Sequence, residues 1–140
     1  MQILTAKTHG YLDYLMVIWL AGAPVVFGLE GVAALVAYSA AAAITVLALL
    51  TDYPVGPIKA IAFPDHVAAD YLVAGIVTLS PWLFGSLNDD PAGVDFVMVS
   101  GLAMLVTAIL TKDRFEPPRM RRRRGPVRLW MRRRTLARAA

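Results

Sequence analysis

Four long apolar stretches, separated by short polar connections, set the pattern of the chain. They run over residues 11–29, 32–50, 67–87 and 93–111. Each holds about 19–21 residues, and a helix of that length, at about 1.5 Å rise per residue, matches the roughly 30 Å hydrocarbon core of a bilayer. We therefore expect an all-α protein with four transmembrane helices.

The composition agrees with a membrane protein. Hydrophobic residues make up 58% of the 140 positions, and the mean hydropathy is +0.58, above the values typical of soluble domains. The chain has no cysteine, which excludes disulfides, thiolate metal sites and a thiol nucleophile. No glycine-rich phosphate loop follows a strand pattern, so we expect neither an enzyme nor a bound cofactor. Pro24 directly after Ala21-Gly22-Ala23 argues against cleavage of the first stretch as a signal peptide.

The chain contains an internal repeat. A shift of 57 residues places His9 on His66, Asp13 on Asp70 and Pro24 on Pro81. The shared pattern is His-x3-Asp-Tyr-Leu followed by Pro-x2-Phe-Gly. We expect a duplicated helical hairpin, with repeat one over 9–51 and repeat two over 66–111, inside a membrane domain of residues 1–111. Because each hairpin crosses the membrane an even number of times, the copies should point the same way, about an axis along the membrane normal.

The basic residues give an orientation. Lys7 precedes the first stretch, Lys59 lies between the second and third, and the other twelve basic residues follow the fourth. The only charged side chains in the two outer turns are acidic: Glu30, Asp89 and Asp90. The excess of positive charge on cytoplasmic loops predicts that both termini are cytoplasmic, in an inner (plasma) membrane.

The tripeptide Ser80-Pro81-Trp82 falls late in the first helix of the second hairpin. In that place it resembles the signature of the SPW-repeat family, over residues 9–111. The first copy has Ala23-Pro24-Val25, so only the proline is common to both. The resemblance implies a small integral membrane protein without a defined biochemical activity. We interpret Pro81 as a kink near the outer boundary, with Ser80 bonding a carbonyl of the preceding turn and Trp82 at headgroup depth.

Two polar pairs interrupt the apolar pattern near the expected cytoplasmic ends. His9 and Asp13, and likewise His66 and Asp70, are four residues apart and share one helix face. If those faces converge, the four groups could bind a metal, a haem or a proton. The other interpretation, which we favour from the sequence, is that they cap helix starts and bridge the hairpins by hydrogen bonds. The function expected is structural or partner-binding, with homo-oligomers or another membrane protein as partners; the alternative is a metal- or haem-binding redox protein.

Positive charge is concentrated in the C-terminal tail, residues 112–140, which holds twelve basic and two acidic residues. We expect a disordered cytoplasmic segment that contacts anionic headgroups. Nucleic-acid binding is the less favoured alternative, because the tail resembles no nucleic-acid module. The candidate lipid-binding residues are Arg121, Arg122, Arg123, Arg124, Trp130, Arg132, Arg133 and Arg134.

The tail predicts a measurable response to lipid charge. With Trp19 and Trp82 replaced by phenylalanine, Trp130 is the remaining tryptophan of the three. In bilayers containing anionic lipid its fluorescence should shift to the blue relative to neutral bilayers, because each arginine near the surface contributes about 1 kcal/mol. High salt should remove most of the shift. An identical spectrum in both bilayers, together with sequence-selective RNA or DNA binding, would contradict the lipid role.

Overall fold

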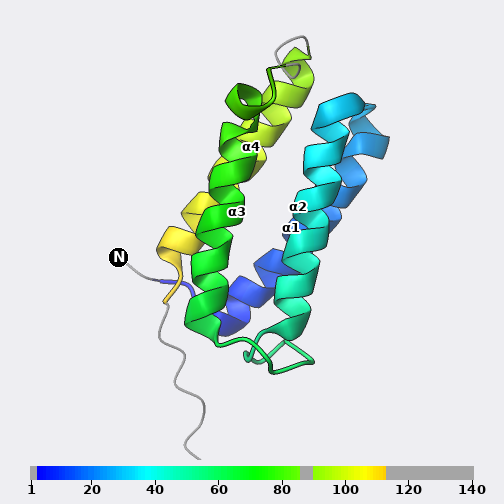
Figure 1. The fold of residues 1–140 in the computed structure, drawn as a ribbon. Helices are drawn as coiled ribbons and strands as arrows, with labels where there is room; N and C mark the ends of the chain where they lie inside the picture. Colours follow the sequence, from blue (N-terminus) through cyan, green and yellow to red (C-terminus); the bar gives the residue numbers. More distant parts are fainter. Residues whose placement is uncertain (1–2, 86–89, 113–140) are drawn as a thin grey trace, which may run out of the picture.

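The computed structural model describes residues 3–85 and 90–112, and within them the fold is a bundle of four helices (Figure 1). The helices are α1 (Ala6–Phe27), α2 (Gly31–Leu50), α3 (Phe63–Leu83) and α4 (Pro91–Leu110). The predicted all-α four-helix bundle is confirmed. The first helix of each hairpin begins earlier than the hydropathy indicated, because the polar residues around His9 and His66 are helical.

The protein is a multi-pass membrane protein. Three of its described helices, α1, α2 and α4, are long and apolar enough to cross a bilayer. Helix α3 has 21 residues but is not among them, since polar residues such as His66, Asp70 and Ser80 lower its hydropathy. Large apolar side chains are exposed along all four helices, among them Leu15, Leu35, Leu72 and Leu102, as expected for surfaces that face lipid.

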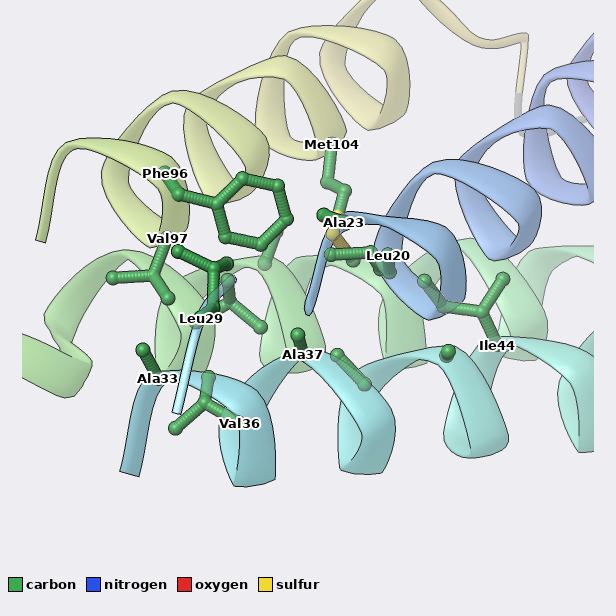
Figure 2. Packing of buried hydrophobic residues seen from close by; sticks show 14 residues of the cluster. Leu20, Ala23, Leu29, Ala33, Val36, Ala37, Ile44, Phe96, Val97 and Met104 are labelled. Atoms are coloured by element: carbon green, nitrogen blue, oxygen red, sulfur yellow. The ribbon is translucent and has the colours of Figure 1, made fainter. Parts of the chain in front are cut away.

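Each helix packs chiefly against its own hairpin partner, α1 against α2 and α3 against α4, and the two hairpins stand side by side (Figure 1). Small residues of α2 fill much of the shared core, where Ala33 and Ala37 lie in one cluster with Leu20 and Val97 (Figure 2). Ala40 belongs to the same cluster. Small side chains let helix backbones approach closely where lipid provides no hydrophobic drive for association. The alanine-rich stretch of α2 therefore forms helix contacts, although Ala42 faces outward.

The outer turns follow from local sequence. Gly28 ends α1 with φ 64°, in the left-handed region that glycine adopts without steric cost. Asp90 caps α4, and its side chain accepts a hydrogen bond from the backbone N–H of Gly93 at 3.0 Å. Pro91 occupies the first turn, where the absent N–H costs nothing. Asp90-Pro91 is a sequence typical of a helix start.

At the opposite end of the bundle the hairpins are tied together by matching backbone hydrogen bonds. The N–H of Leu4, before α1, donates to the carbonyl of Leu110 at the end of α4. The N–H of Ile61, before α3, donates in the same way to Leu50 at the end of α2, and both distances are 2.9 Å. Leu4 and Ile61 are equivalent in the repeat. The residue before the first helix of each hairpin therefore bonds to the end of the second helix of the other hairpin. This exchange is what a two-fold relation between the copies requires.

Pro24 and Pro81 both lie in the last turn of their helices, so a kink at either can redirect only the helix end. Pro81 has no N–H to give to Val77, the carbonyl four residues back. The hydroxyl of Ser80 donates to that carbonyl instead, at 2.7 Å, and Ser80 is fully buried. The serine before the proline thus replaces the lost backbone bond. Trp82 is 68% exposed, and its depth in the bilayer stays a prediction.

This substitution of donors can be tested by a double-mutant cycle. Ser80→Ala should lower the free energy of unfolding by about 1–3 kcal/mol, because it leaves the buried Val77 carbonyl unsatisfied. In a Pro81→Ala background the same change should cost little, since residue 81 then supplies its own N–H. Reversible denaturation in mixed micelles measures both values. Equal costs in the two backgrounds would contradict this role of Ser80.

Candidate functional site

The structure brings four ionisable side chains together at the end of the bundle where the hairpins are tied. His9 and Asp13 come from α1, and His66 and Asp70 come from α3. One ligand atom from each residue lies within 4.8 Å of the other three. All four are buried: the histidines are 1% and 0% exposed, and Asp13 and Asp70 are 6% and 5% exposed. We call these residues the His/Asp centre.

Within the His/Asp centre, the Nε2 atom of each histidine faces both carboxylates. His9 Nε2 lies 2.9 Å from Asp70 Oδ2 and 3.4 Å from Asp13 Oδ1. His66 Nε2 lies 3.2 Å from Asp13 Oδ2 and 3.2 Å from Asp70 Oδ2. The two shortest contacts between helices join His9 to Asp70 and His66 to Asp13. Each hairpin therefore contributes one histidine and one aspartate, and each contacts the other hairpin.

Helix geometry explains this convergence. A spacing of four residues puts each histidine and aspartate on the same face, about one turn apart. These residues do not cap the helix starts, because the N-caps are Thr5 and Ala62. The expected hydrogen bonds between the hairpins are present, from His9 to Asp70 and from His66 to Asp13. Asp13 lies beyond the first turn of α1, where the field of the helix terminus has fallen off. The negative charge of each carboxylate is instead compensated at its contact with the histidine of the other hairpin.

Two threonines, not predicted from the sequence, hold the histidine rings in orientation. Thr51 and Thr111 directly follow α2 and α4, and each hydroxyl lies 2.8 Å from a histidine Nδ1, of His66 and His9 respectively. Each hydroxyl also donates its single hydrogen to a carbonyl of its own helix. It can then only accept from the histidine. We therefore assign the Nδ1 hydrogen to both histidines.

The position of the Nδ1 hydrogens determines how much positive charge the His/Asp centre requires. A neutral histidine with its hydrogen on Nδ1 presents a lone pair at Nε2, and a carboxylate has only acceptors. Lone pairs at 2.9–3.4 Å repel unless a cation lies between them. Two carboxylates buried together also require two positive charges for neutrality. Two protons or one divalent metal ion satisfy both conditions.

The connection between α2 and α3 covers the His/Asp centre at the end of the bundle. The prolines of this segment are typical of a surface loop, and Pro54 and residues 57–60 are exposed. Tyr53, however, is 1% exposed and packs against Phe63 and His66 at ring-centroid distances of 5.9 and 5.7 Å. Gly10 makes room for it, because a Cβ there would run into the Tyr53 ring. Burial and the nearby Asp13 carboxylate raise the pKa of the phenol above its usual value, so it stays protonated. The Tyr53 hydroxyl nevertheless has no hydrogen-bond partner of acceptable geometry among the described residues.

The other predicted site residues lie elsewhere. Ser80, Pro81, Trp82 and Pro24 are at the opposite ends of α1 and α3, far along the bundle from the His/Asp centre. The arginines proposed to bind lipid and Trp130 lie outside the described residues. A signal for the missed threonines existed in the sequence: Leu50-Thr51 and Leu110-Thr111 occupy the same place at the end of each hairpin.

Comparisons with known proteins add no family to this geometry. No protein-family model, curated protein or solved structure matches the chain.

Proposed function

We propose that this multi-pass membrane protein binds one divalent transition-metal ion, zinc by preference, in the His/Asp centre, and that the ion clamps its two hairpins together. The observation that carries the proposal is the convergence of two histidine Nε2 atoms and two carboxylates, buried together with one ligand atom from each residue within 4.8 Å of the other three. The function is structural: four protein ligands close the ion's coordination, as in structural rather than catalytic zinc sites. A haem does not suit this site, because the histidine rings are 5.4 Å apart with the carboxylates beside them.

The distances support a tetrahedral ion. Zinc bound to nitrogen and carboxylate oxygen at about 2.0–2.1 Å has neighbouring ligands about 3.3 Å apart. The four nitrogen–oxygen contacts of the His/Asp centre range from 2.9 to 3.4 Å. Asp13 presents Oδ1 to His9 and Oδ2 to His66, so with one oxygen from each aspartate three of these contacts are edges of such a tetrahedron. The four ligand atoms all lie within 4.8 Å of one another, and the side chains would draw closer around an ion.

The surroundings of the His/Asp centre also suit a metal. Ligating histidines commonly donate their second nitrogen to an oxygen, which fixes the ring and strengthens the ligand. Thr51 and Thr111 provide that contact to His66 and His9. The unpartnered hydroxyl of Tyr53 is a donor next to Asp13, and a small adjustment would let it support a ligating carboxylate. In the absence of metal, two protons take the ion's place.

Metal analysis of the purified protein tests this proposal. We expect about one zinc per chain and, after exchange with cobalt, the intense visible absorption of tetrahedral Co²⁺. Asp70→Asn and His66→Gln should each lower metal affinity at least tenfold, because each removes a ligand. Asp65→Asn is the matched control, since Asp65 is an exposed carboxylate on the first turn of α3. Metal content that is absent, or equal in Asp70→Asn and Asp65→Asn, would contradict the proposal.

We further propose that α3 crosses the membrane with the other three helices, that both termini are cytoplasmic, and that the chain belongs to the SPW-repeat family. The paired hairpins support four crossings, because α3 is equivalent to α1 in the repeat and packs beside α4. The one-sided lysines and arginines support the orientation. In this arrangement the His/Asp centre lies toward the cytoplasmic leaflet and the basic tail leaves the bundle on the same side.

Reporter fusions test the topology. Fusions after Thr51 and Thr111 should be active only with a cytoplasmic reporter, and one at Glu30 only with an external reporter. The Glu30 fusion is the internal control, since a single chain must place it opposite to the others. An external signal after Thr111 would show that the number of crossings or the orientation is wrong.

A further inference from the structure

A cavity of about 350 Å³ opens between α1 and α4, beside the His/Asp centre. Its walls are apolar and flexible, with Leu12, Met16 and Met104 among them. One end is formed by His9, Asp13 and Asp70; the other is formed by Trp19 and Ser100, whose indole N–H and hydroxyl oxygen are 2.9 Å apart. The volume is at the lower limit of pockets that hold small organic ligands.

The cavity is accessible from the membrane. Leu15 and Val99 line it, and they are 62% and 64% exposed on the side of the bundle that faces lipid. A ligand that enters between these side chains must therefore dissolve in the hydrocarbon core. The volume is too small for a phospholipid with two acyl chains, but it admits one ring whose tail projects outward between the helices.

The polar end of the cavity offers a hydrogen-bond acceptor. Oδ2 of Asp70 contacts both histidines, whereas Oδ1 makes no hydrogen bond to any described residue. Asp70 is a wall of the cavity and is 5% exposed. A carboxylate oxygen has no hydrogen to donate, so its partner must be a donor. A ligand hydroxyl would satisfy it without disturbing the contacts of Oδ2.

The two halves of the duplicated chain differ at this place. Trp19 of α1 corresponds to Ile76 of α3, and Met16 corresponds to Val73. The His/Asp centre is thus the same in both repeats, while the groove beside α1 has acquired a large indole and a flexible thioether. The α1–α4 groove therefore has an indole and a thioether where α3 has only Ile76 and Val73.

We propose that this cavity binds a phenolic lipid of the hydroquinone type, with a hydroxyl donating to Asp70 Oδ1 and the tail leaving between Leu15 and Val99. A flat ring fits between the thioethers of Met16 and Met104, which adapt their shape and contact aromatic faces favourably. A phenol is a stronger donor than an alkyl alcohol, so it suits a carboxylate acceptor. The inference goes beyond metal binding and does not depend on it, because Oδ1 remains available whether protons or an ion occupy the His/Asp centre.

Binding can be followed through Trp19 in the full chain reconstituted in nanodiscs, with Trp82 and Trp130 replaced by phenylalanine. The probe is a decyl-substituted 1,4-hydroquinone, and the control ligand is its dimethyl ether, which has the same shape but no donor. The hydroquinone should change Trp19 emission saturably. The ether should bind about tenfold more weakly or worse, as expected when a hydrogen bond to a charged acceptor is not made.

A pair of variants locates the site. Ala103→Leu fills the cavity, which Ala103 lines, and should abolish the saturable change. Ala42→Leu is the matched control, an exposed alanine on α2 that does not line the cavity. Equal affinity for the hydroquinone and its ether, or equal binding by both variants, would overturn the proposal. Zinc content is measured on the same samples: zinc without ligand discrimination refutes only the lipid site, and discrimination without zinc refutes only the metal site.

Discussion

The packing of the two hairpins depends on the balance of charge in the buried His/Asp centre. Two carboxylates and two imidazoles lie inside a bundle whose outer surface faces lipid, where an unpaired ionised group is expensive and usually marks a function. Thr51 and Thr111 hold the Nδ1 hydrogens, so the Nε2 atoms of His9 and His66 turn toward Asp13 and Asp70. The hairpins can pack only if two positive charges accompany these groups. That requirement joins the two halves more specifically than apolar contacts in a bilayer can.

The duplication explains how so short a chain builds such a site. One hairpin supplies a single His–Asp pair on one helix face, which cannot surround an ion. The second hairpin brings a second pair opposite the first. The exchanged backbone bonds at Leu4 and Ile61 hold the entry of each hairpin against the exit of the other, next to the threonines that orient the histidines. The sequence repeat therefore accounts for both the matching hairpins and the four metal-ligand side chains of the His/Asp centre.

Much of this architecture was predictable from the sequence, because hydropathy and repeat spacing are local properties. The four helices, the Asp90 cap and the alanine contacts of α2 follow from such patterns. The sequence left open whether the His–Asp faces converge, since helix rotation depends on packing between hairpins. It also did not reveal the burial of Tyr53, because two prolines and several polar residues make its segment resemble a surface loop. The burial of Tyr53 depends on the space that Gly10 leaves on another helix, which no local pattern reveals.

The two positive charges that the His/Asp centre requires can be two protons or one divalent ion. Counting the protons released when zinc binds to metal-free protein in weakly buffered micelles near neutral pH tests this requirement most directly, because metal ligands must be deprotonated. We expect about two protons per bound zinc, and a release near zero in Asp70→Asn, which should not bind the ion tightly. Zinc that binds tightly to the native protein with no proton release would contradict this requirement, since the histidines and carboxylates would then face each other without a cation.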